Sequence, residues 1–116
     1  MDNDILRLTE ELAEKLRQSP EYLRYISCKE RAYADETTRM LLTDYAKLQY
    51  KLQAASLSGN MSEEELTKLQ KLGELLQLNS DASEYLFAQY ALNSLVSEVY
   101  SKLGQAVGID LSMFEA

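Results

Sequence analysis

Hydrophobic residues recur at spacings of three and four along most of this chain, which is the spacing of one face of an α-helix. The longest such stretch covers residues 81–107 and contains no proline. At 1.5 Å per residue it predicts a helix of roughly 40 Å. Such a helix is not stable alone in water, so its apolar stripe must pack against other helices. The stripe consists of Tyr85, Ala88, Leu92, Leu95, Val96, Val99, Leu103 and Ala106.

The same periodicity predicts four earlier helices, which cover approximately residues 3–17, 20–31, 36–57 and 63–78. Asp35 is a plausible cap for the third helix, and Ser62 with Glu65 forms a capping box at the start of the fourth. Gly59 follows the third helix, where a glycine commonly ends the helical pattern. Residues 32–34 fit two alternatives, since they can fray or continue into the next helix.

These elements predict an all-α fold. We expect an antiparallel helical bundle of four main helices plus one short helix, residues 20–31, because the linkers are only a few residues long. Residues 36–57 and 63–78 form a long helical hairpin, and the long C-terminal helix returns along it. Gly73 lies within this hairpin and predicts close approach of another helix. The length suits a single domain, residues 1–116, in which residues 109–116 form a C-terminal tail.

The third predicted helix is apolar on two sides. Its main seam has heptad-like spacing and consists of Leu41, Tyr45, Leu48, Leu52 and Ala55. A second row lies nearly opposite and consists of Leu42, Ala46, Tyr50 and Leu57. A helix with two apolar sides sits between two layers. One layer can be this chain, and the other can be a second copy of it.

Two aromatic residues, Phe87 and Tyr90, project away from the stripe of the C-terminal helix. They suggest a contact surface, although exposed aromatic residues also occur singly without a function. We therefore expect a homodimer or higher homo-oligomer, with the second row of the third helix as the first choice of interface. The Phe87/Tyr90 face is the second choice. The alternative is a monomer in which the first helix folds over one of the two rows.

Candidate chemistry is scarce. The chain has no histidine, which is the commonest general base and the usual nitrogen ligand of metals. The single cysteine, Cys28, cannot supply a zinc or iron–sulfur site within one chain, and it suits a small packed residue. No glycine-rich phosphate loop is present. We therefore expect no enzymatic activity, no catalytic or metal-binding residues and no cofactor.

The formal net charge of −7 disfavours direct binding to nucleic acid, because an acidic chain repels phosphates. One local basic cluster consists of Arg24, Lys29, Arg31 and Arg39, and it suits a solvated face paired with Glu21, Glu30 and Glu36. No segment approaches the roughly 20 apolar residues of a membrane span, and the N-terminus does not resemble a signal peptide. We expect a cytoplasmic protein that does not insert into membranes.

Several of these elements occur together in one known family. Ser19-Pro20-Glu21-Tyr22 follows a short first helix, and Tyr45, Leu48 and Gln49 lie on the long third helix. A glycine turn precedes SEEEL, and Asn79 precedes the long C-terminal helix. Over almost its whole length the chain resembles the YlbF/YmcA family of small bacterial helical proteins.

The resemblance implies an all-helical, self-associating cytoplasmic protein without enzymatic activity. Members of the family are associated with competence, sporulation and biofilm formation, and some influence RNA processing. Some hold iron–sulfur clusters through cysteines near the C-terminus. This chain ends in GIDLSMFEA, which contains no cysteine, so cluster binding is not carried over.

The leading hypothesis is a regulatory adaptor that acts through contacts with protein partners. The alternative is a structural or chaperone-like helical oligomer without a dedicated regulatory partner. A third hypothesis is a carrier of a small ligand in the bundle core.

Overall fold

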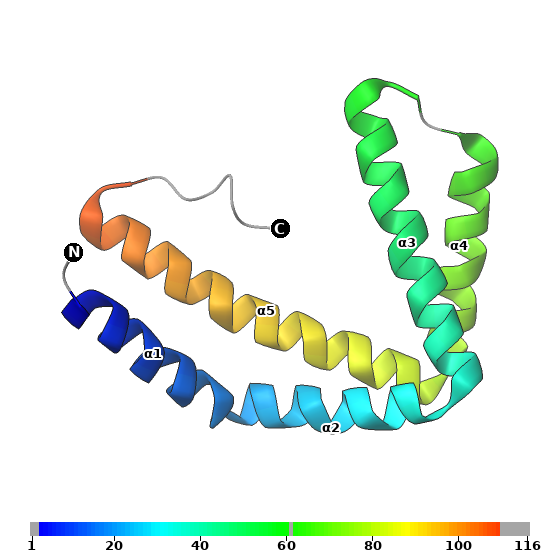
Figure 1. The fold of residues 1–116 in the computed structure, drawn as a ribbon. Coiled ribbons are helices and arrows are strands. Elements are labelled where there is room, and N and C mark those ends of the chain that lie inside the picture. Colours follow the sequence, from blue (N-terminus) through cyan, green and yellow to red (C-terminus); the bar gives the residue numbers. More distant parts are fainter. Residues whose placement is uncertain (1–2, 61, 110–116) are drawn as a thin grey trace. The chain divides into compact units, whose positions relative to one another are not determined.

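The computed structural model describes residues 3–60 and 62–109, which form five helices and no strand. The predicted all-α class is therefore confirmed (Figure 1). The helices are α1 (Asn3–Arg17), α2 (Pro20–Ala34), α3 (Glu36–Ser58), α4 (Glu63–Leu78) and α5 (Ser80–Val107). The described helices include none that is both long enough and apolar enough to cross a membrane.

Helix α2 ends at Ala34 and α3 begins at Glu36, so residues 32–34 extend the second helix without joining it to the third. The break occurs at Asp35, whose backbone is extended, with φ −93° and ψ 122°. The side chain of Asp35 accepts a hydrogen bond from the backbone N–H of Thr38. This bond satisfies a backbone donor that has no partner within the helix, and it confirms Asp35 as the N-cap.

The two ends of the α3–α4 turn also follow their predicted local chemistry. Gly59 has φ +77°, a left-handed conformation that glycine adopts without steric cost, and its N–H bonds back to the end of α3. Ser62 accepts a hydrogen bond from the backbone N–H of Glu65 at the start of α4. Helices α1 and α4 have the bounds expected from the sequence.

The chain divides into two compact units, which are described separately. One consists of Cys28–Leu86, and the other combines Met1–Ser27 with Phe87–Ala116. We call them the hairpin unit and the terminal unit. Helices α2 and α5 each contribute residues to both. The prediction of a single domain stays a prediction.

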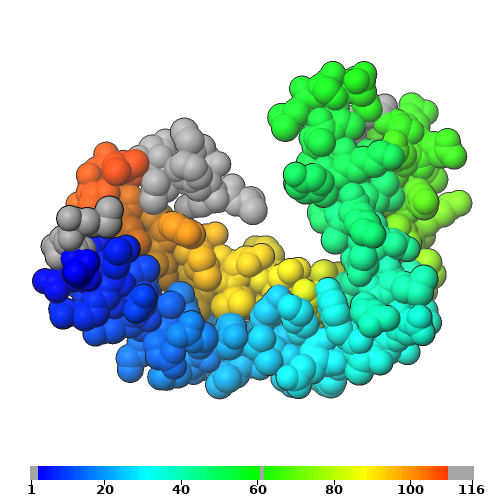
Figure 2. All heavy atoms as spheres, viewed as in Figure 1, coloured from blue at the N-terminus to red at the C-terminus, as the bar shows by residue number. Residues whose placement is uncertain are grey.

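In the hairpin unit, α3 and α4 pack side by side along the hairpin (Figures 1 and 2). Leu52 of the predicted seam is buried, whereas the rest of that seam is half-buried. A Cβ atom added at Gly73 would lie 3.6 Å from Cε2 of Tyr45. The neighbouring helix therefore approaches Gly73 as predicted, but at an ordinary van der Waals distance that leaves room for a methyl group.

The main core of the hairpin unit lies where α2 and α4 end and where α3 and α5 begin. We call this region the helix junction. An ion pair between Arg31 and Glu84 and an edge-to-face contact between Tyr33 and Tyr85, with ring centroids 5.6 Å apart, join α2 to α5. The buried residues of the junction are Cys28, Ala32, Thr38, Leu42, Leu76, Ala82 and Tyr85.

The terminal unit buries far less. Helix α1 contains no buried residue, and its apolar residues Ile5 and Leu8 are exposed. The predicted stripe of α5 is buried at Ala88 and half-buried from Leu92 to Val99, but Leu103 and Ala106 are exposed, contrary to the prediction. Residues of α5 from Phe87 onward group with α1. The expectation that the C-terminal helix returns along the hairpin stays a prediction.

Candidate interaction surfaces

A chain of hydrogen bonds crosses the helix junction. The hydroxyl of Thr38 donates to Oδ2 of Asp35 at 2.7 Å, and Nδ2 of Asn79 donates to the same hydroxyl oxygen at 2.8 Å. Asn79 in turn accepts at Oδ1 from the backbone N–H of Ala82 at 3.1 Å. The N-cap of α3 is thereby connected to the N-cap of α5, and the relative position of the two helix starts is held by polar contacts.

Burial and charge explain why this chain of bonds is stable. Thr38 is only 2% exposed, and a buried hydroxyl without partners would cost free energy. The hydrogen bond from the Thr38 hydroxyl, assisted by that from its backbone N–H, lowers the pKa of Asp35 below its usual value. The shift has this direction because the ionised carboxylate accepts both hydrogen bonds. Sequence reasoning identified Asp35 as a cap and placed Asn79 directly before the long C-terminal helix, but it missed their connection through Thr38.

The predicted pairing of the basic cluster is wrong for Arg31. Its guanidinium lies 3.2 Å from the carboxylate of Glu84 on α5, and it also contacts Sγ of Cys28 at 3.3 Å. Cys28 itself is buried, as expected for a small packed residue. Both side chains of the Arg31–Glu84 pair are exposed, so the pair links α2 to α5 but contributes little stability.

The second apolar row of α3 is split by the fold. Leu42 is 5% exposed and belongs to the helix junction, so the prediction that it lies on a free surface is wrong. The physical reason is its position: the junction surrounds the first two turns of α3, where Thr38 is also buried. Farther along the helix, Ala46 is exposed, Tyr50 is 76% exposed and Leu57 is 92% exposed.

The aromatic pair on α5 is exposed as predicted, with Phe87 at 67% and Tyr90 at 73%. Both residues lie in an uncharged run, residues 85–97. The exposed end of α3, including Leu57, lies in a second uncharged run, residues 52–62. Contact surfaces between proteins are depleted of charge at their centres, so both runs have the composition of an interface core. Whether Ala46, Tyr50, Leu57, Phe87 and Tyr90 form an interface stays a prediction.

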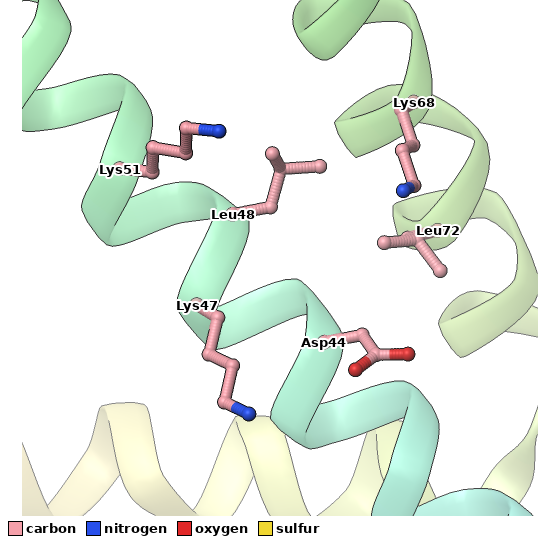
Figure 3. Close-up of a pocket in the computed structure, with 6 residues that line it drawn as sticks. All are labelled: Asp44, Lys47, Leu48, Lys51, Lys68 and Leu72. Atoms are coloured by element: carbon pink, nitrogen blue, oxygen red, sulfur yellow. The ribbon is translucent and has the colours of Figure 1, made fainter.

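A third surface is a cleft of about 290 Å³ between α3 and α4. Leu48 and Leu72 point toward one another across it, and lysines from both helices extend along its sides (Figure 3). The lining residues are Asp44, Lys47, Leu48, Lys51, Lys68 and Leu72. This cleft was not expected from the sequence, because it depends on which faces of α3 and α4 come together.

Most of the predicted tail, residues 110–116, lies outside the described residues, including Leu111, Met113 and Phe114. Ile109 is described and is exposed. Within residues 3–60 and 62–109, no group of three or more acidic, cysteine or histidine side chains is placed to hold a metal ion. The expectations of no metal and no enzymatic activity stay predictions.

Comparison with known proteins shows which proteins this chain resembles. The family model described as control of competence regulator ComK, YlbF/YmcA, matches residues 5–108. A UPF0342 protein of Halothermothrix orenii is 34% identical over 105 residues, which cover 88% of this chain and 89% of that protein. A UPF0342 protein of Symbiobacterium thermophilum is 33% identical over 101 residues, which cover 86% and 90%.

Two solved structures share the fold. A protein of unknown function (DUF964) from Bacillus stearothermophilus has a TM-score of 0.79 at 18% identity, with 90% of this chain and 93% of that chain covered. RicA of Bacillus subtilis, crystallised in complex with RicF, has a TM-score of 0.66 at 22% identity, with 93% and 96% covered. At these identities the likeness supports the all-helical fold.

Proposed function

Because this chain belongs to the YlbF/YmcA family, we propose that it is a non-enzymatic regulatory adaptor that acts through protein–protein contacts in the cytoplasm. The observation that carries the proposal is the large apolar surface left exposed by the terminal unit and by the far end of α3. RicA, which has the same fold, forms a complex with another protein, RicF, and this supports a role in contacts of that kind. Competence, sporulation, biofilm formation and RNA processing are the candidate pathways.

Self-association is part of this proposal. A net charge of −7 makes contact between two copies unfavourable wherever carboxylates oppose each other. The uncharged runs 52–62 and 85–97 avoid this repulsion, and a two-fold dimer needs only one self-complementary patch. The terminal unit has the smaller core of its own, so its Phe87/Tyr90 face gains more from being covered than does the row on α3. We therefore favour the α5 face, whereas sequence reasoning placed the α3 row first.

Sedimentation velocity at micromolar concentration tests self-association. We expect a dimer or larger species, and a single species at the chain mass of 13.2 kDa would overturn this part of the proposal. Tyr90→Glu and Tyr50→Glu are a matched pair, since each places the same charge on a similarly exposed tyrosine. Tyr90→Glu should raise the dissociation constant of the dimer roughly tenfold or more, because burying an unpaired carboxylate costs free energy. Dissociation by Tyr50→Glu alone would assign the interface to α3.

The alternative function is a structural or chaperone-like oligomer without a dedicated partner. Affinity capture of the native protein from its own cells distinguishes the two functions. An adaptor retains a few partners in stoichiometric amounts, and Tyr90→Glu or Tyr50→Glu should release them selectively. Capture of many proteins in small amounts, unaffected by either substitution, would favour the chaperone-like function.

A further inference from the structure

The α3–α4 cleft concentrates positive charge in an acidic protein. Three of the 12 lysine and arginine residues of the chain, Lys47, Lys51 and Lys68, line it together with a single carboxylate, Asp44. On α3, Asp44, Lys47, Leu48 and Lys51 are spaced at i, i+3, i+4 and i+7, so they share one face. Tyr50 projects about 100° around the helix from Lys51, so it lies outside this face, and the cleft is distinct from the uncharged row on the same helix.

Apolar and charged groups are segregated within the cleft. Leu48 and Leu72 are half-buried and face each other from the two helices, so they form an apolar floor (Figure 3). Lys47 and Lys51 come from α3 and Lys68 from α4, which places ammonium groups along both walls.

Two of these ammonium groups form no ion pair within the part of the chain that the structure describes. Lys51 forms an ion pair with Glu65 at 3.1 Å. Among the described residues, no ion pair engages Lys47 or Lys68, and both side chains are exposed. Opposite walls of the cleft therefore each carry a cation that an incoming carboxylate can reach.

We propose that this cleft is a docking site for an acidic amphipathic helix of a partner protein. An apolar ridge on such a helix covers Leu48 and Leu72, and carboxylates on its two sides pair with Lys47 and Lys68. A helix of about 10–12 Å diameter laid in a groove between helices is a recurring mode of recognition. The proposal rests on the proposed function, since it assumes that the partner is a protein.

Other occupants use the cleft less well. A nucleic acid carries a phosphate at every nucleotide and would be repelled by Glu63, Glu64 and Glu65 at the start of α4, whereas a helix can carry its carboxylates beside the lysines alone. A small inorganic anion would leave the leucine floor uncovered, and it would meet ammonium groups that are already well solvated.

Fluorescence anisotropy with a synthetic probe tests the proposal. The probe is a labelled helical peptide with leucines at alternating spacings of three and four and glutamates on both flanks of the leucine ridge. We expect saturable binding that weakens when ionic strength rises from about 0.02 M to about 0.2 M, because exposed charges are screened. The double variant Lys47→Glu/Lys68→Glu should weaken binding roughly tenfold or more.

The control is Lys15→Glu/Lys102→Glu, which makes the same change in net charge at two exposed lysines of the terminal unit and also removes the exposed ion pair of Lys102 with Glu98. It should change the dissociation constant less than about threefold. All substituted lysines are exposed, so circular dichroism should show unchanged helicity in both double variants.

Four results would overturn the proposal: no binding of the acidic peptide, equal weakening by the control variant, equal binding of a peptide with lysines in place of the glutamates, or tighter binding of a single-stranded RNA oligonucleotide at the same lysines. Failure of the peptide to bind while the protein still sediments as a dimer would reject the cleft and leave the proposed function standing. A monomer that still binds the peptide would reject self-association alone.

Discussion

The hairpin unit and the terminal unit are both helical, but they differ in what they bury. Almost every buried side chain of the described residues lies in the hairpin unit, including Leu76, Thr38 and Tyr85. In the terminal unit Ala88 is the only buried hydrophobic residue described, while Ile5, Leu8 and Phe87 remain exposed. Amphipathic helices derive most of their stability from packing of the apolar face. The hairpin unit meets this requirement with its own buried residues, whereas the terminal unit leaves many of its apolar side chains exposed.

The largest expected difference between the units comes from leucine deletions. Leu76→Ala should lower the free energy of unfolding by about 2–5 kcal/mol, because Leu76 is 2% exposed and leaves a cavity in the junction. Leu8→Ala in α1 should change the free energy of unfolding of the dilute protein by no more than about 0.5 kcal/mol. Chemical denaturation at two protein concentrations provides the measurement. A loss for Leu8→Ala that appears only at high concentration would locate α1 in the oligomer interface.

A second test concerns the polar chain of the junction. Thr38→Val keeps the shape of the side chain but removes the hydroxyl that joins Asp35 to Asn79. The substitution should lower the free energy of unfolding by about 1–3 kcal/mol, since Asp35 and Asn79 each lose a hydrogen bond. Thr37→Val is the control, because Thr37 is the exposed neighbour on the same helix. Equal effects of the two substitutions in urea denaturation would contradict the role assigned to the Thr38 hydroxyl.

Two glycines of the hairpin should respond to alanine with opposite signs. Gly73→Ala should raise the free energy of unfolding by up to about 1 kcal/mol, because the helix favours alanine and the new methyl group meets Tyr45 at an ordinary distance. Gly59→Ala should lower it by about 1 kcal/mol, since its φ of +77° strains any residue with a Cβ atom. Destabilisation by Gly73→Ala would indicate that the ring of Tyr45 lies closer to the added Cβ atom than the 3.6 Å given by the structure.

The smallest expected effect is a pH dependence at the start of α3. Hydrogen bonds from Thr38 lower the pKa of Asp35 in the folded state, so the folded protein binds its proton less readily than the unfolded chain does. The resulting stabilisation is complete above the unfolded pKa of about 3.9, and it is lost as the pH falls through the lower folded value. Asp35→Asn should therefore be less stable than the parent protein at neutral pH, and the difference should shrink in acid. A difference that grows below about pH 4 would contradict this assignment.

The candidate surfaces were predictable in part. Four residues are exposed as their positions on the helical faces indicated: Tyr50, Leu57, Phe87 and Tyr90. Leu42 shares the helical row of Tyr50 yet is buried, since the junction surrounds the start of α3. The cationic cleft also depends on tertiary packing, because Lys47 and Lys68 line one cleft only when α3 and α4 pack in a particular register.

What the sequence determined by itself was local: the five helices and the caps that separate them, including Asp35, Gly59 and Ser62. These features depend on apolar spacing and on hydrogen bonds between residues three or four apart, so a short window of sequence contains the information. Only the tertiary structure decided that Thr38 meets Asn79, which lies 41 positions away, and that nearly all burial belongs to the hairpin unit. Such contacts depend on the directions in which helices leave their turns, and helical periodicity does not encode those directions.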